Sequence, residues 1–146
     1  MSDGADGSRA TFTREQVERA VAEVAARLPG VRPTDLPDFV NRDAGYPFLR
    51  IEGEKLLLLA HERGRECFRQ EATELDELLY LCFEKVTKQV AQREELARRR
   101  LWSRRDSRRR WFPRWVELMA GLDPAWGART RAHVDQVLAG YPYRGR

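Results

Sequence analysis

The stretch FLRIEGEKLLLLAHERGRECFR, residues 48–69, decides the fold class. It divides into three strand candidates: residues 48–52, 55–60 and 65–69. Gly53 and Gly64 separate them, at positions where tight turns need residues that tolerate a positive φ. The leucine run 56–59 is apolar on both faces, so we expect that strand to be central and covered by helices. The simplest arrangement is a three-stranded antiparallel meander.

A helix is predicted ahead of these strands. Thr13 can cap its first turn while Gln16 reaches back three residues later, which is the pattern of a capping box. Apolar residues then recur at helical spacing until Pro29 and Gly30 stop the run. Residues 31–46 contain two prolines, a glycine and several Asp and Asn residues, which predicts a structured loop.

Two further helices are predicted after the strands. Thr73 is expected to cap the first, which carries a broad apolar stripe from Leu75 to Val90 and is expected to run past Leu96 as the longest element. Asp106-Ser107 can cap the next helix. Pro113 falls inside that pattern, so either the helix kinks there or it begins there with proline as its first residue.

The last predicted helix has clear boundaries. Asp123 is the expected cap, Pro124 takes the first helical position and Gly140 ends the helix. Its inward face is predicted to hold Trp126, Thr130, His133, Val134, Val137 and Leu138. The element order is an N-terminal helix, a three-stranded meander and three C-terminal helices, which is an α+β fold.

Length and composition favour one soluble domain. The chain has 146 residues, and residues 1–10 are small and polar, so we expect a disordered tail followed by a single domain over residues 11–146. No apolar run approaches the roughly 20 residues needed to cross a bilayer, and the N-terminus lacks a signal-peptide layout. These features predict a cytoplasmic protein without membrane contact. Cys67 and Cys82 form no CxxC pair and are expected to be reduced and buried.

Catalytic groups are scarce in this sequence. His61 and His133, its two histidines, are far apart and belong to no metal-ligand motif. We expect His133 to be packed in the core, and His61 to be a turn residue beside Glu62. No glycine-rich phosphate loop occurs. The sequence therefore predicts a protein that is not an enzyme and that uses no cofactor and no metal.

Arginine and aromatic residues concentrate in residues 98–115. Between Arg98 and Arg114 lie nine arginines and a single acid, Asp106, in a chain with a net charge of only +4. The interleaved aromatic residues are Trp102, Trp111, Phe112 and Trp115. Three interpretations remain open: a solvated helix face whose tryptophans are core, a protein-binding hot spot, or a nucleic-acid-binding surface. The modest net charge and the lack of a known nucleic-acid-binding motif disfavour the third.

Several short landmarks resemble the immunity protein 63 family of bacterial polymorphic toxin systems, from about Pro47 to the C-terminus. They are Glu62-Arg63-Gly64, the helix start LDELLY at 75–80, Asp106-x-Arg108-Arg109-x-x-Phe112, Glu117-Leu118, Leu122-x-Pro124-x-Trp126 and Tyr141-Pro142. The resemblance implies an immunity-type domain that acts as a cytoplasmic antidote. It would neutralise a cognate toxin by stoichiometric protein–protein binding, without a cofactor.

Such an antidote needs a buried anchor ringed by complementary charge. The predicted partner-binding patch is therefore Arg108, Arg109, Trp111 and Trp115. The residues expected to orient the scaffold are Glu62, Tyr80 and Asp106, the last by capping a helix. The alternative function is a nucleic-acid-binding accessory protein that uses residues 98–115.

Overall fold

The computed structural model describes residues 11–99 and 104–145. These residues form two compact units. Among the described residues, unit 1 comprises 11–23 and 36–82, and unit 2 comprises 24–35, 83–99 and 104–145. The predicted tail at 1–10 lies outside the described residues, and the single domain over 11–146 stays a prediction.

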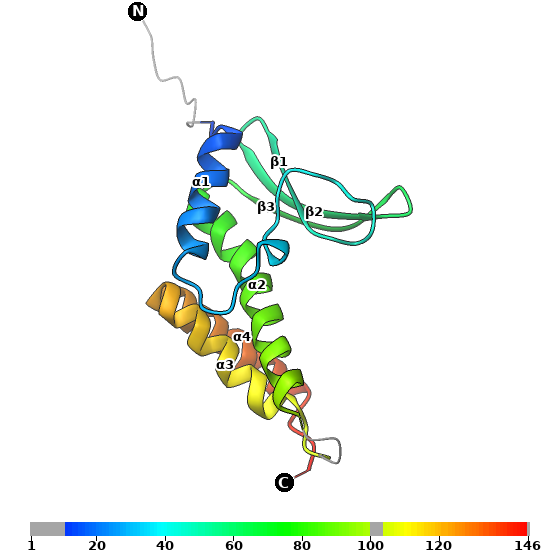
Figure 1. Cartoon of the computed structure of the whole chain (residues 1–146), viewed down its shortest axis with the longest axis vertical. Helices are drawn as coiled ribbons and strands as arrows, with labels where there is room; N and C mark the ends of the chain where they lie inside the picture. The colour runs from blue at the N-terminus through cyan, green and yellow to red at the C-terminus, as the bar shows by residue number, and fades with distance from the viewer. Residues whose placement is uncertain (1–10, 100–103, 146) are drawn as a thin grey trace, which may run out of the picture. The chain divides into compact units, whose positions relative to one another are not determined.

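Unit 1 is built on the predicted meander. Strands β1 (Phe48–Glu52), β2 (Lys55–Glu62) and β3 (Arg65–Ala72) pair antiparallel in the order β1-β2-β3 (Figure 1). The central position of β2 is confirmed, and its four leucines are at most 1% exposed. Strand β2 is longer than predicted because Arg63 and Gly64, with φ of 55° and 75°, form a two-residue turn that pairs Glu62 directly with Arg65. Strand β3 is longer at its other end, where residues 70–72 pair with Leu56, Leu57 and Leu58 of β2.

The first helix, α1 (Arg14–Ala25), begins with the predicted capping box. The backbone N–H of Gln16 donates to Thr13 Oγ1 (3.1 Å), and the backbone N–H of Thr13 donates to Gln16 Oε1 (2.8 Å). Most of α1 belongs to unit 1, and its last two residues belong to unit 2. The capping-box prediction is confirmed.

The loop that precedes β1 is held against the β2–β3 turn. Asp43, at φ 51°, accepts the backbone N–H of Gly64 with both carboxylate oxygens (2.8 and 3.0 Å). The backbone N–H of Gly45 donates to the His61 carbonyl (2.8 Å). These bonds confirm the expectation of a structured rather than a loose loop.

Unit 2 contains the C-terminal part of α2 (Leu75–Arg98), followed by α3 (Arg108–Leu122) and α4 (Pro124–Gly140). A single residue, Asp123, joins α3 to α4, and its side chain accepts the backbone N–H of Ala125 (2.8 Å). Helix α4 runs back alongside α3 (Figure 1). The helices approach closely at Gly127, where an added Cβ would lie 2.6 Å from the Ala120 Cα. The predicted limits of α4 are confirmed.

One of the two alternatives considered at Pro113 is excluded, and the cap of α2 lies one residue later than predicted. Helix α3 begins at Arg108 and continues through Pro113, so a start at Pro113 is wrong. The first backbone bond of α2 runs from the Leu78 N–H to the Glu74 carbonyl, which makes Glu74 the cap position instead of Thr73. Helix α2 passes Leu96, as predicted, and is the longest element that the structure describes. No helix within 11–99 and 104–145 combines the length and apolarity needed to span a membrane.

Candidate partner-binding site

Asp106 is the centre of the candidate site, just before α3. Its side chain is 1% exposed. Arg108 donates to it from the backbone N–H (3.1 Å), from Nε to both carboxylate oxygens (3.1 Å each) and from Nη2 (2.6 Å), and the Arg144 N–H adds a further bond (3.0 Å). The Arg108 side chain and then the Arg144 amide hold the pKa of the Asp106 carboxyl well below its usual range. Asp106 therefore binds the backbone N–H of Arg108, the first residue of α3, but the cap position itself is held by Ser107, which makes no side-chain capping bond. Asp106 also anchors a distant part of the chain.

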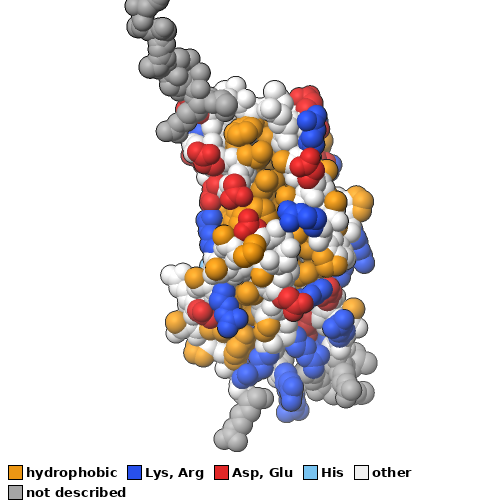
Figure 2. Space-filling view, turned by 90° about the vertical axis from the view of Figure 1, so that its left-hand side faces the viewer, with side chains coloured by type: hydrophobic (Ala, Val, Ile, Leu, Met, Phe, Trp, Pro, Cys, Tyr) orange, Lys and Arg blue, Asp and Glu red, His pale blue; other side chains and the backbone are white. Residues whose placement is uncertain are grey.

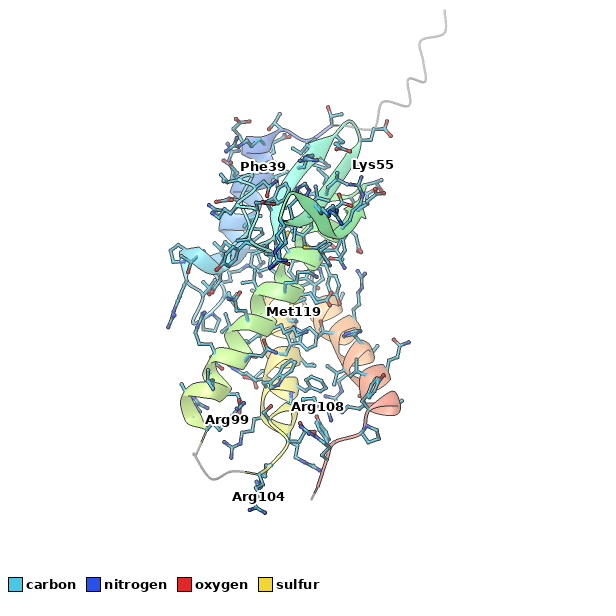
Figure 3. All side chains as sticks on the ribbon, turned by 90° about the vertical axis from the view of Figure 1, so that its right-hand side faces the viewer. Phe39, Lys55, Arg99, Arg104, Arg108 and Met119 are labelled. Carbon is cyan, nitrogen blue, oxygen red and sulfur yellow. The ribbon has the colours of Figure 1, made fainter. Side chains whose placement is uncertain are left out.

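That distant part is the C-terminal segment, residues 141–145. Arg108 donates from Nη1 to the Tyr141 carbonyl (2.8 Å) and from Nη2 to the Pro142 carbonyl (2.9 Å). The ring of Tyr143 lies against Phe112, with 6.2 Å between centroids. Figure 3 shows Arg108 between the start of α3 and this segment. The pairing of charged and aromatic residues here fastens the C-terminal segment to α3.

Arg108 and Arg109 are adjacent in sequence but differ in how fully they are bonded. Arg108 donates from Nε, Nη1 and Nη2 to the Asp106 carboxylate and the two backbone carbonyls. Arg109 donates from Nη2 to the Gly145 carbonyl (2.8 Å), and its guanidinium lies 4.8 Å from the Tyr143 ring centroid. The Arg109 Nε is buried and has no hydrogen-bond partner. Arg108 is thus an internal clamp, whereas Arg109 keeps an unused donor.

Trp115 is a core residue, so its assignment to the contact patch is wrong. It is 2% exposed, and its indole N–H donates to the Glu84 carbonyl (2.9 Å). Trp111 is only partly buried, tilted against Trp115 at 5.9 Å between centroids, with the Lys88 ammonium 5.8 Å from its ring. Trp111 therefore remains available to a partner, and Trp115 does not. Trp102 lies outside the described residues.

The remaining arginines of the cluster are partly neutralised within unit 2. Arg114 pairs with Glu94 (2.8 Å) and Glu117 (2.6 Å), and Arg99 pairs with Glu95 (2.7 Å). The Arg114 side chain lowers the pKa of Glu94. The interpretation of a solvated face paired with acids of the preceding helix thus describes these residues.

Other arginines of the cluster stay exposed. Arg104 and Arg110 have no ion-pair partner among the described residues. Figure 2 shows Lys and Arg side chains gathered at this end of unit 2, and Arg104 extends away from the helices in Figure 3. The positive surface is therefore local, and it lies around the start of α3.

The two other residues predicted to orient the scaffold lie in unit 1. Glu62 is exposed at the end of β2, where it pairs with Arg65 across the turn and forms an isolated bridge with Ala44. Tyr80 is 3% exposed in α2. Glu62 therefore has a structural position in a strand and Tyr80 has one in a helix. Neither residue belongs to the same unit as Asp106.

The histidines and cysteines depart from the predictions in part. His133 is exposed, with only a ring-edge contact to Trp115 at 5.8 Å between centroids, so the prediction of a core histidine is wrong. Cys82 is buried as expected, whereas Cys67, on β3, is exposed, so the prediction of a buried Cys67 is wrong. His61 lies on β2 rather than in a turn, edge-on to Phe48. No group of three potential metal ligands occurs within the residues that the structure describes.

The model of the family described as immunity protein 63 matches residues 52–136, more than half of the chain. The chain belongs to the immunity protein 63 family. The match runs from the end of β1 into α4, so it includes Asp106, Arg108 and Arg109 and leaves out the C-terminal segment. No curated protein and no solved structure matches the chain. Immunity protein families are generally non-enzymatic.

Sequence reasoning missed Tyr143 as a site residue. Its ring lies between Phe112 and the guanidinium of Arg109, and it completes the attachment of the C-terminal segment. The signal was present in the landmark Tyr141-Pro142, which ends in proline and therefore cannot continue a helix. What the pattern alone does not indicate is which helix receives such a segment.

Proposed function

We propose that this immunity protein 63 family member is a bacterial cytoplasmic antidote that neutralises a cognate toxin by forming a stoichiometric complex with it. The family match carries this proposal. On this view the chain catalyses no reaction and uses no cofactor. It presents a preformed surface that occludes the toxin or holds it inactive.

The surface around the start of α3 is the proposed interface. Trp and Arg are the residues most enriched in interface hot spots, and Trp111, Arg104 and Arg110 are all at least partly exposed there. Unpaired surface arginines favour an acidic partner and speed its association through electrostatic steering. The internal ion pairs of Arg99, Arg108 and Arg114 reduce the charge left for this purpose, so we expect a local contact and not a broad positive face.

Co-expression with the neighbouring open reading frame tests the function. We expect the neighbour to be toxic alone and harmless with this chain present, and the two purified proteins to form a complex of fixed stoichiometry. A neighbour that is harmless alone, or that stays toxic in the presence of the chain, contradicts the proposal.

A charge-reversed pair of variants tests the interface. Arg104→Glu combined with Arg110→Glu should slow association with the toxin at low salt by roughly tenfold or more, because rim charges act mainly on the association rate. Arg19→Glu combined with Arg63→Glu is the matched control, since both arginines are exposed, both lie in unit 1, and the pair changes the net charge by the same amount. An equal effect of both changes would exclude the start of α3 as the interface.

Nucleic-acid binding is the competing outcome. Exposed arginines beside Trp111 could neutralise phosphates and stack on bases. A titration of generic DNA against salt separates the two functions. Binding tighter than about 10⁻⁶ M at physiological salt, weakening steeply as salt rises, would replace the antidote proposal with the accessory-protein alternative.

A further inference from the structure

The donor edge of Arg109 formed by Nε and Nη2 is incompletely used. Nη2 donates to the Gly145 carbonyl (2.8 Å), and the neighbouring Nε is buried without an acceptor. The two N–H groups of such an edge point in parallel and match the two oxygens of one carboxylate. A single neutral carbonyl satisfies one of them and leaves the other desolvated, which is an unfavourable state for a guanidinium.

The C-terminal segment is what covers this edge. Tyr143 lies over the Arg109 guanidinium, and Gly145 supplies the carbonyl that Nη2 binds. Residues 141 and 142 are fastened separately, through their carbonyls to Arg108. Departure of residues 143–145 from Arg109 would also break the Tyr143 contact with the Arg108 guanidinium (5.6 Å) and the bond from the Arg144 N–H to Asp106 (3.0 Å). Arg108 would still retain residues 141 and 142 and its own bonds to Asp106.

We propose that the Nε–Nη2 edge of Arg109 is a carboxylate-binding site for an acidic side chain of the protein partner, and that residues 143–145 are a displaceable strap over it. The identity of the partner as a toxin rests on the proposed function. The site and the strap follow from the bonding of Arg109. Arg108 is excluded as the site because its Nε and both Nη atoms already donate to Asp106 and to the segment.

A carboxylate competes well for this position. Charge-assisted hydrogen bonds are roughly twice as strong as those to neutral acceptors, and a bidentate carboxylate would satisfy both Nε and Nη2. The strap has the advantage of being part of the same chain, with an effective concentration in the millimolar range for a short connection. A free acidic peptide must therefore be present at millimolar concentration, whereas a partner that also binds elsewhere can open the strap at a lower concentration.

Amide hydrogen exchange in the full-length chain tests the proposal, with hexaglutamate as the probe and hexaglutamine as the neutral control. The Arg144 N–H is bonded to Asp106 (3.0 Å), so its exchange reports whether the strap is closed. Saturating hexaglutamate at low salt should speed its exchange about tenfold, and hexaglutamine should not. Arg109→Lys should abolish the response because an ammonium cannot bind a carboxylate through two parallel bonds. Arg110→Lys, the same change at the exposed neighbour, should keep it.

Three results would overturn the proposal. The first is no change in Arg144 exchange with hexaglutamate. The second is an equal response in the Arg109→Lys and Arg110→Lys chains, which indicates diffuse attraction. The third is an equal, Arg109-dependent response to the oligonucleotide dT10, which assigns the site to phosphate instead of carboxylate.

A second measurement covers the case in which Arg109→Lys itself opens the strap. The Nε–H resonance of Arg109 in the unmodified chain should move downfield when hexaglutamate binds, and a resonance that does not move counts against the site. Neither measurement involves the toxin. If these measurements contradict the strap, the immunity function is still tested separately by co-expression. If co-expression contradicts the immunity function, the carboxylate site is still tested by hydrogen exchange and the Arg109 resonance.

Discussion

Replacing Trp115 with alanine should destabilise the protein severely, because its side chain is core. The indole is 2% exposed and packs against Trp111 and Phe112, with centroid separations of 5.9 and 6.3 Å. Truncating a buried Trp to Ala costs about 3–5 kcal/mol, and the lost bond to the Glu84 carbonyl (2.9 Å) belongs to that loss. We expect a decrease of about 4 kcal/mol in the free energy of unfolding, from a total of about 5–15 kcal/mol typical of such domains.

Urea denaturation followed by circular dichroism at 222 nm measures this loss. With a denaturant slope of about 2 kcal/mol per M, a 4 kcal/mol decrease lowers the unfolding midpoint by about 2 M. Trp111→Ala removes the same side chain from a partly exposed position and should lower the midpoint by less than half as much. A Trp115→Ala midpoint no lower than that of Trp111→Ala would refute the assignment of Trp115 to the core.

Three further predictions concern packing, ion pairing and pH. Gly127→Ala should destabilise the protein by about 1–3 kcal/mol in the same urea assay, because the new Cβ would meet the α3 backbone. Gly121→Ala is the control, since a Cβ there would have no atom within 4 Å, and it should be neutral or stabilising. Equal effects of the two substitutions would contradict the close approach of α3 and α4 at Gly127. Arg93→Ala should cost about 3 kcal/mol by stranding the buried Asp35 carboxylate, which it binds at 2.7 Å, and a loss below about 1 kcal/mol measured by thermal unfolding would contradict this. The pKa of Asp106 is lowered on folding, so its stabilising effect should be complete above about pH 4–5 and fall at lower pH. The stability gap between the native chain and Asp106→Asn should therefore narrow on acidification, and a gap independent of pH between 2 and 6 would count against the buried ion pair.

The features predicted correctly from the sequence are those fixed by neighbouring residues. The capping box at Thr13 and the Asp123 cap of α4 depend on bonds spanning two or three residues, and both form as expected. The meander depends on two short turns around an apolar strand, and it also forms. In each case interactions between residues close in sequence determine the local structure, so tertiary contacts change it little.

The wrong predictions concern the burial of side chains on helices, which depends on how each helix is oriented and on contacts with residues far apart in the sequence. Trp111 and Trp115 are four residues apart and share a face of α3, so their spacing alone does not tell which of the two lies deeper. The same applies to His133, whose position on α4 fits the apolar stripe although its ring is exposed. A periodicity of 3.6 residues identifies a buried face, but the depth at each position depends on which other helix packs there.

The different roles of Arg108 and Arg109 show most clearly what a sequence leaves undetermined. Adjacent residues on a helix point about 100° apart, so Arg108 can bind Asp106 and the carbonyls of residues 141 and 142 while Arg109 binds the Gly145 carbonyl. The bonds that distinguish them span up to 36 residues in sequence; they use Nε, Nη1 and Nη2 of Arg108 but leave Arg109 Nε without an acceptor. An arginine-rich run therefore predicts positive charge, but it does not indicate which guanidinium donors remain unbonded in the folded protein. Because a partner can bind only the donors that the fold has left unused, the unmet Nε of Arg109 is a sharper guide to the interface than the number of arginines around it.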